Sequence, residues 1–428
     1  MKKFLFVLCG ATVLFSACDK KEILPGKRES VEGINESAKF DKEILNSTIR
    51  ISVTPSTVVS EYKDVAGNKQ HKALNYKVAQ NPKMLWKTSI GGAQISSEPI
   101  AFNGHAYVVN SHGDLVCIEL KDGKQKWSLN IAKQPDDASF AGGITAENSV
   151  IYASTNIGDV VAVNTTTQKI LWKKSLKYPL RGAPLYADGI VIVNSIDGQT
   201  FALNALNGNV IWMKKLQGEM TVMSKASTPA LFGHSIICAY SSGDLKSYDL
   251  RSGGDNWDDV LFSANLSDSG SVMAHIVASP VVSNGNILAT TSESGMVMFD
   301  ASSGVRIWEN EIGTINTPLV NSGWIFVLTQ TGAVICLSEK DGSIKWVSEV
   351  KELLPDQYSK DAEFVGALLI NGAVMVFSNT NNIVTLDIST GKIKGITNID
   401  GADTIVAPIV IDGRIIAVNS RAELYAIG

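Results

Sequence analysis

A short motif that recurs along the chain constrains its fold more than any other feature. Seven times a tight turn leads into a strand-like run, and six of these runs reach a tryptophan four residues after the second residue of the turn. The tryptophans are Trp127, Trp172, Trp212, Trp257, Trp308 and Trp346, and the seventh run has Gly395 in their place. Self-similarity with a period of roughly 40 residues is typical of an array of one repeated unit. We therefore expect one array over most of the 428 residues, and not several unrelated domains.

Two earlier turns divide each unit into apolar runs rich in Val, Ile and Ala. The first turns lie at 103–104, 147–148, 188–189, 232–233, 284–285, 322–323, 371–372 and 412–413, and the second turns near 113, 158, 198, 243, 295, 332, 382 and 420. Several first turns are Asn-Gly or Asp-Gly, which favour the positive-φ turns that match strand twist. No segment carries a sustained helical period, so the sequence predicts an all-β array with four strands in each unit.

The numbers of turns predict how the array ends. There are eight first turns and eight second turns, but only seven third turns. The chain stops at Gly428 directly after a third strand, while an outer-strand pattern around Trp86 stands before the first unit without inner strands of its own. We expect this N-terminal strand to complete the last unit and close a ring. Radial repetition of four-stranded sheets is a β-propeller, so residues 83–428 are predicted to form an eight-bladed β-propeller with its tryptophans buried between blades.

The N-terminus has the pattern of a targeting segment. Lys2 and Lys3 precede an apolar run over 4–16, which is too short to span a bilayer and fits a signal peptide. Ser16 and Ala17 lead into Cys18, which resembles a bacterial lipobox with Phe15 where Leu is usual. We expect a lipoprotein signal peptide over 1–17 and a lipidated N-terminus and tether over 18–82. The alternative is an ordinary secretory signal with an incidental cysteine.

Composition argues against several classes of function. The net charge is −4 and basic residues are scattered among acids, whereas nucleic-acid binders carry a basic stripe. Cys117, Cys238 and Cys336 lie in apolar runs and are odd in number, which indicates buried thiols and no disulfide framework. The five histidines lack metal-site spacing. The sequence therefore predicts no catalytic residues, no metal and no cofactor. The long connections at 258–278 and 350–363 have no assigned role.

The turn-to-tryptophan motif resembles the repeat of the pyrroloquinoline quinone (PQQ) propeller superfamily. That superfamily contains quinoprotein dehydrogenases and non-enzymatic binders. The enzymes carry an adjacent cysteine pair and a calcium-plus-quinone site, and this sequence has no adjacent cysteines. The resemblance therefore implies PQQ-like repeats without the enzyme's chemistry. A PQQ-dependent dehydrogenase remains one alternative function, and a propeller adaptor of another envelope complex is a second.

The lipobox, the eight units and the stretch Leu180-Arg181-Gly182 together resemble the BamB family, lipoprotein subunits of the machinery that inserts β-barrels into the outer membrane. The resemblance implies a non-catalytic scaffold that docks on the periplasmic POTRA domains of a BamA-like barrel, with unfolded outer-membrane proteins as further partners. Leu180 and Arg181 would contact the partner, with Tyr178 beside them. The competing interpretation places Leu180 in the blade core and Arg181 in solvent.

The same resemblance implies a protein anchored by lipid in the outer membrane and facing the periplasm. Asp19, directly after Cys18, resembles the signal that retains lipoproteins in the inner membrane of enteric bacteria. Sorting between the two membranes therefore stays open at this point.

Overall fold

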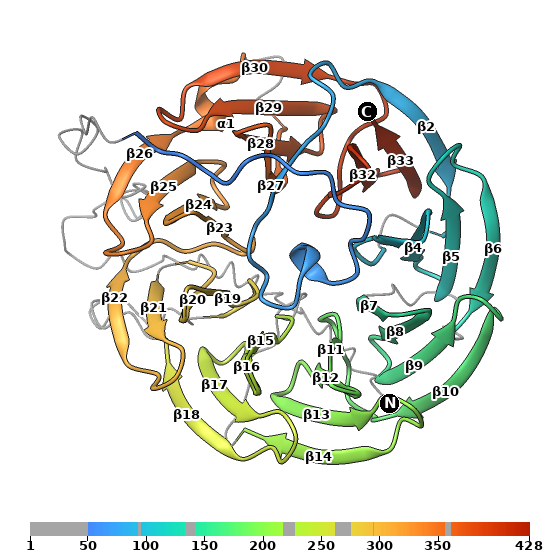
Figure 1. The fold of residues 1–428 in the computed structure, drawn as a ribbon. Helices are drawn as coiled ribbons and strands as arrows, with labels where there is room; N and C mark the ends of the chain where they lie inside the picture. The colour runs from blue at the N-terminus through green and yellow to red at the C-terminus, as the bar shows by residue number, and fades with distance from the viewer. Residues whose placement is uncertain are drawn as a thin grey trace, which may run out of the picture. The chain divides into compact units, whose positions relative to one another are not determined.

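The computed structural model describes residues 50–92, 96–132, 142–216, 227–261, 275–293, 295–355 and 361–428. All of them belong to one compact unit, residues 42–428. Within these residues the strands form eight separate sheets arranged as a ring (Figure 1). The predicted eight-bladed β-propeller is therefore confirmed. In this part of the chain, no helix has the length and apolar character needed to cross a membrane.

Each blade is an antiparallel sheet that runs outward from the ring axis. Blade 1 holds β3 (Ile100–Phe102), β4 (His105–Val109), β5 (Asp114–Glu119) and β6 (Gln125–Asn130), and blade 2 holds β7 (Ile144–Glu147), β8 (Val150–Ser154), β9 (Asp159–Asn164) and β10 (Lys169–Ser175). Blade 3 holds β11 (Leu185–Ala187), β12 (Ile190–Asn194), β13 (Gln199–Asn204) and β14 (Val210–Lys215), and blade 4 holds β15 (Ala230–Phe232), β16 (Ser235–Ala239), β17 (Asp244–Asp249) and β18 (Asp255–Val260).

The second half of the ring continues the same order. Blade 5 holds β19 (Val281–Ser283), β20 (Asn286–Thr290), β21 (Met296–Asp300) and β22 (Arg306–Asn310), and blade 6 holds β23 (Leu319–Asn321), β24 (Trp324–Leu328), β25 (Val334–Ser338) and β26 (Ile344–Ser348). Blade 7 holds β27 (Phe364–Ile370), β28 (Ala373–Ser378), β29 (Asn382–Asp387) and β30 (Ile393–Asn398), preceded by the short helix α1 (Val350–Leu353). Blade 8 holds β31 (Ile409–Ile411), β32 (Arg414–Val418) and β33 (Glu423–Ile427).

The N-terminal strand closes the ring as predicted. Strand β2 (Met84–Ser89) pairs antiparallel with β33 as the outer strand of blade 8, with Trp86 opposite Ala426. Lys83 and Gly428 exchange two backbone hydrogen bonds of 3.1 Å. Two ends of the sequence thus share one sheet, and the eighth blade exists only because both are present.

Every outer strand carries a β-bulge directly before its tryptophan position. The register shifts by one residue there in all eight blades, at Leu85, Lys126, Leu171, Ile211, Asn256, Ile307, Lys345 and Lys394. A bulge leaves one residue unpaired and bends the strand, which discourages edge-to-edge association. The chain therefore presents one bulged residue per blade along its rim.

The tryptophans seal the boundaries between blades. At six boundaries the indole N–H donates to a carbonyl in the third turn of the next blade, at 2.8–3.0 Å, the pairs being Trp86–Leu120, Trp172–Ala205, Trp212–Leu250, Trp257–Ala301, Trp308–Glu339 and Trp346–Ile388. The ring also lies against the glycine of that turn, as Trp172 lies against Gly208. Gly395 precedes blade 8, where the junction of Lys83 and Gly428 replaces the third turn. The tryptophan is therefore missing where it has no turn to pack on.

Residues 50–78, here named the axial strap, lie against the ring. The strap crosses the centre of the propeller in Figure 1 and includes a short 3₁₀ turn, Val65–Gly67, and strand β1 (Asn75–Tyr76), which pairs parallel with β27. Its carbonyls accept hydrogen bonds from inner-strand or first-turn N–H groups, in the pairs Tyr62–Ala101, Lys63–Ala146, Lys69–Leu231, Gln70–Val282, Tyr76–Asn371 and Val59–Asp412. The sequence left the order of residues 18–82 open. Its second half is packed, and the first half lies outside the described residues.

Candidate partner-binding face

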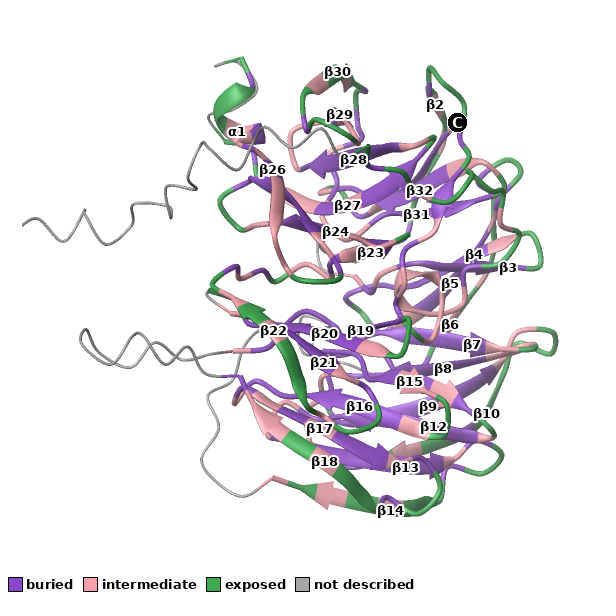
Figure 2. Cartoon of the chain, turned by 60° about the vertical axis from the view of Figure 1, so that its left-hand side comes forward, coloured by how far each residue is buried: buried purple, intermediate pink, exposed green. Residues whose placement is uncertain are grey.

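The two faces of the ring differ in what covers them. First and third turns open on one face, and the strap lies there, with the amide of Asp412 bound to the carbonyl of Val59 and the hydroxyl of Ser389 bound to the carbonyl of Ile51. Second turns and the connections between blades open on the opposite face, here named the loop face. Figure 2 shows the buried strands that separate the two. Leu180 and Arg181 lie in a connection between blades and therefore belong to the loop face.

The strap also enters the ring axis. His71 is 1% exposed, and its Nδ1 lies 2.8 Å from the carbonyl oxygen of Pro280, the residue before β19. Burial lowers the pKa of His71 to about 4, so the imidazole is neutral near pH 7 and its Nδ1–H can donate to that carbonyl. The strap thus reaches from its own face to the start of an inner strand.

That connection is held on both sides. From blade 2, the amides of Leu176 and Leu180 donate to the carbonyls of Gly158 and Thr155, at 2.8 and 3.1 Å. From blade 3, the amide of Ile196 donates to the carbonyl of Pro179 at 3.0 Å. The loop is therefore pinned between the second turns of two blades, which fixes the backbone that carries the predicted site.

The three predicted residues differ in exposure. Leu180 is completely buried, pairs with Ser195 in an isolated β-bridge and packs with Val160, Val193 and Phe201. Tyr178 is half-buried, and its ring stacks on Phe201 with 5.9 Å between centroids. Arg181 is partly exposed. The structure brings the three together, but it places the Leu180 side chain in the core between blades 2 and 3, and not on the surface.

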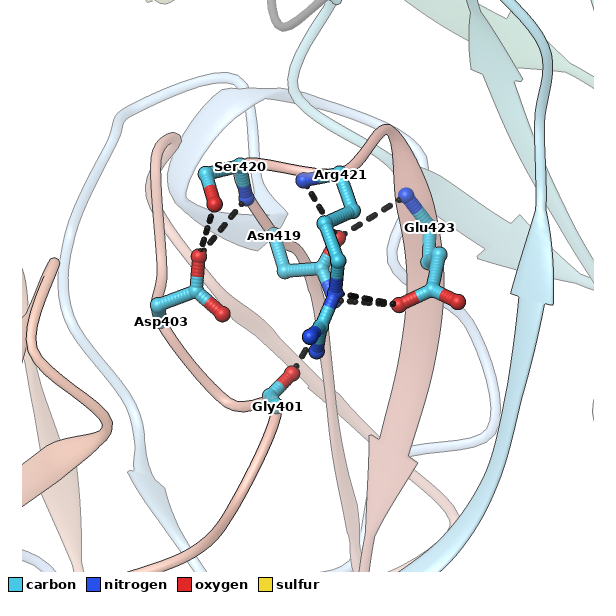
Figure 3. A network of polar contacts seen from close by, with 6 residues as sticks. All are labelled: Gly401, Asp403, Asn419, Ser420, Arg421 and Glu423. Carbon is cyan, nitrogen blue, oxygen red and sulfur yellow. Dashed lines mark hydrogen bonds and ion pairs between the residues drawn. The ribbon is translucent and has the colours of Figure 1, made fainter.

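The loop face also carries a cluster of polar side chains at blade 8 (Figure 3). The carboxylate of Asp403 accepts hydrogen bonds from the amide and hydroxyl of Ser420. The amide group of Asn419 donates to Gly401 and Glu423, and the guanidinium of Arg421 pairs with Glu423 at 3.2 Å. The hydrogen bond from Asn419 lowers the pKa of Glu423. Sequence reasoning located this turn but not the cluster.

The signal that could have revealed this cluster is a repeated asparagine. Asn110 directly follows the second strand of blade 1, as Asn419 follows that of blade 8. Each caps its second turn and donates to the connection that enters its own blade from the preceding one, Asn110 to Ile90 and Asn419 to Gly401. The repeated residue therefore ties two turns of the loop face to neighbouring connections.

The cysteines have the environment expected of core residues. Cys117, Cys238 and Cys336 are buried and unpaired, and burial raises the pKa of both Cys117 and Cys238 to about 12. Across the described ranges, no three His, Cys, Asp or Glu side chains gather where they could hold a metal ion. Cys18, the predicted lipidation site, lies outside the described residues.

A family model described as outer membrane protein assembly factor BamB matches residues 130–348, just over half of the chain. The chain belongs to the BamB family. A BamB of Moranella endobia is 24% identical over 366 residues, which cover 81% of this chain and 90% of that protein. The crystal structure of BamB from Moraxella catarrhalis has a TM-score of 0.68 at 17% identity, covering 81% of this chain and 99% of that one. The BamB resemblance drawn from the sequence is thereby confirmed.

The same fold occurs in enzymes. A europium-containing methanol dehydrogenase gives a TM-score of 0.68 at 12% identity, covering 86% of this chain and 98% of that one. Similarity at this level of identity concerns the fold alone. The BamB relatives are named as assembly factors, so the dehydrogenase alternative has less support than the assembly role.

Proposed function

We propose that this protein is a non-catalytic scaffold of the outer-membrane protein assembly machinery. It docks on the periplasmic POTRA domains of a BamA-like barrel and aids the insertion of β-barrel proteins. Family membership supports the assembly role. The docking site is proposed at the 176–184 connection of the loop face.

The pinned connection is the observation that carries the site proposal. Arg181 stands partly exposed on a backbone held by hydrogen bonds from blades 2 and 3. A backbone that is already fixed needs no further ordering on binding, and arginine is common among the residues that dominate interface energies. Tyr178 would add contact area beside it. Leu180 acts beneath them as a positioning residue, because its side chain is buried.

Envelope extraction with a tagged protein tests both parts of the proposal. A BamA-like barrel should co-purify with the wild-type protein and with Arg251→Glu, an exposed charge reversal on the strap face, but not with Arg181→Glu. Absence of any such barrel from the wild-type preparation would refute the assembly role. Equal recovery with Arg181→Glu would refute the docking site and leave the assembly role standing.

We also propose that the protein is anchored through a lipid on Cys18, faces the periplasm and resides in the outer membrane. The apolar run before Cys18 and the small residues Ser16 and Ala17 support lipidation. One acyl chain gives only marginal membrane binding, so stable anchoring requires several chains or a second contact. Metabolic labelling with palmitate should label the wild type and not Cys18→Ala. Fractionation of wild type against Asp19→Ser tests whether Asp19 diverts the protein to the inner membrane.

A further inference from the structure

The rim of blades 2 and 3 exposes an apolar surface. Six aliphatic or thioether side chains are 40–87% exposed on β10, β14 and the third turn between β13 and β14, namely Ile170, Leu171, Leu206, Val210, Ile211 and Met213. We name these six the rim patch. Strands β10 and β14 are the outer strands of successive blades and follow one another along the rim in Figure 1. Contiguous exposed apolar residues on a soluble domain generally mark an interaction site.

The bulge positions differ in polarity around the rim. The bulged residue is polar in blades 1, 4, 6 and 7, as Lys126, Asn256, Lys345 and Lys394. Polar bulges protect sheet edges from association. The other four blades place an aliphatic residue there, Leu85, Leu171, Ile211 and Ile307, and of these blades 2 and 3 are adjacent and each has a further exposed apolar neighbour on its strand. These two edges are therefore not protected in the way that half of the ring is.

The segments that carry the rim patch are rich in lysine and contain no acidic residue. Residues 160–187 and 198–216 contain no Asp or Glu, while they hold six lysines and Arg181. Lys173 and Lys214 pair with Asp159 and Asp255. Within the described part of the chain, Lys169, Lys174, Lys177 and Lys215 form no ion pair. The next blade reverses the sign, since residues 244–259 contain five aspartates against one lysine and one arginine.

The composition favours a membrane surface over a protein partner. Protein interfaces are depleted in lysine and enriched in aromatic residues and arginine. The rim patch has aliphatic side chains flanked by lysines, which is the pattern of surfaces that lie on anionic bilayers. Each lysine near such a surface strengthens binding by about fivefold, so four unpaired lysines provide a substantial attraction.

We propose that the rim patch contacts the bilayer, with its aliphatic side chains at the headgroup level and Lys169, Lys174, Lys177 and Lys215 on anionic phospholipid headgroups. The contact would set the orientation of the ring, with the rim of blades 2 and 3 toward the membrane. It goes beyond the scaffold function and does not depend on Arg181 docking a barrel.

A depth probe on the rim tests the contact. The full-length protein, purified in mild detergent, is reconstituted with phosphatidylcholine vesicles with and without phosphatidylglycerol, both containing brominated acyl chains as quenchers. An environment-sensitive dye is placed on Leu171→Cys or Ile211→Cys. Asn256→Cys is the matched control, because it occupies the same bulge position in blade 4 beside Asp255 and Asp258. The native cysteines Cys117, Cys238 and Cys336 are buried, so we expect them to react little with the dye. Labelling of the unsubstituted protein measures any background reaction, including that of Cys18.

Dyes at positions 171 and 211 should be quenched several-fold more than the dye at 256, and only with phosphatidylglycerol present. Lys174→Glu with Lys215→Glu should lower the quenched fraction at position 211 at least about tenfold, whereas Lys126→Glu with Lys345→Glu should leave it within about twofold. Equal quenching at 171 and 256 would overturn the proposal. The proposal would also be overturned if the fluorescence of the dye at 171 did not change with vesicles but changed with a purified BamA-like barrel in detergent. The rim patch would then be a protein interface.

Discussion

The indole of Trp172 lies so close to Gly208 of the next blade that a Cβ on Gly208 would stand 2.5 Å from the ring. The same indole donates its N–H to Ala205 in that turn. The turn glycine and the tryptophan four residues later therefore pack at the two opposite boundaries of one blade. Each of the six glycines of these third turns receives the tryptophan of the preceding blade, and Trp127 differs because Gln168 takes the place of the glycine in the following turn.

This relationship predicts a large difference between two glycines of blade 3. Gly208→Ala should lower the free energy of unfolding by about 2–4 kcal/mol, because the methyl group displaces Trp172 and the backbone φ is +70°. Gly189→Ala is the control, since Gly189 has φ +79° and nothing within 4 Å of its would-be Cβ. That variant should lose only about 1 kcal/mol. Urea unfolding measures both, and equal losses would contradict the packing argument.

The blades, the ring closure and the tryptophan boundaries could be predicted because they repeat. Turn residues and strand periodicity are local, and counting them left Trp86 without a sheet, which identified the closing strand. The axial strap could not be predicted in this way. It has no repeat, and its order comes from inner-strand N–H groups, such as that of Val282, that only the assembled ring presents.

The candidate site was predictable only in part for a similar reason. The family motif located the loop, but the burial of Leu180 depends on Ser195 and Phe201 of the next blade. Such contacts between blades leave no mark on the local sequence around Leu180. The sequence thus singled out the connection without showing which of its side chains reaches the surface.

Asn321 should hold the start of the strap to blade 6. Its side chain accepts from the amide of Thr54 at 2.9 Å and donates to the Thr54 hydroxyl and the Ala73 carbonyl at 3.1 and 2.9 Å. Asn321→Ala leaves the carbonyl of the buried Ala73 without this donor, at a cost of about 1–3 kcal/mol. Hydrogen exchange should accelerate at Thr54 and its neighbours while the amides of β24 stay protected. Uniform acceleration over the ring would indicate instead that the strap and the blades unfold together.

Strap docking should weaken in acid because of His71. Burial lowers the pKa of its imidazole to about 4, against an ordinary value of about 6.5, while the Pro280 hydrogen bond and Glu98 act in the opposite direction. The stabilisation is complete above pH 6.5 and is lost as the pH falls toward 4, since the unfolded state then binds the extra proton. The loss amounts to about 3 kcal/mol.

Unfolding free energies measured between pH 7 and pH 4 test whether stability falls as the pH is lowered. His71→Asn is the appropriate comparison, because asparagine tolerates the backbone φ of 57° at this position and does not titrate. The difference in stability between wild type and His71→Asn should shrink as the pH falls through this window. A difference that stays constant would mean that His71 is not the titrating group.

Leu180 and Arg181 should separate stability from binding. Leu180→Ala removes a completely buried side chain between blades 2 and 3 and should cost about 2–5 kcal/mol of stability. Arg181→Ala changes a partly exposed side chain and should alter stability by less than about 1 kcal/mol, while weakening the barrel complex at least about tenfold. Thermal unfolding and binding to purified POTRA domains distinguish the two effects. If Leu180→Ala kept wild-type stability and lost binding, Leu180 would have to leave its buried position when the partner docks, and its assignment as a positioning residue would be wrong.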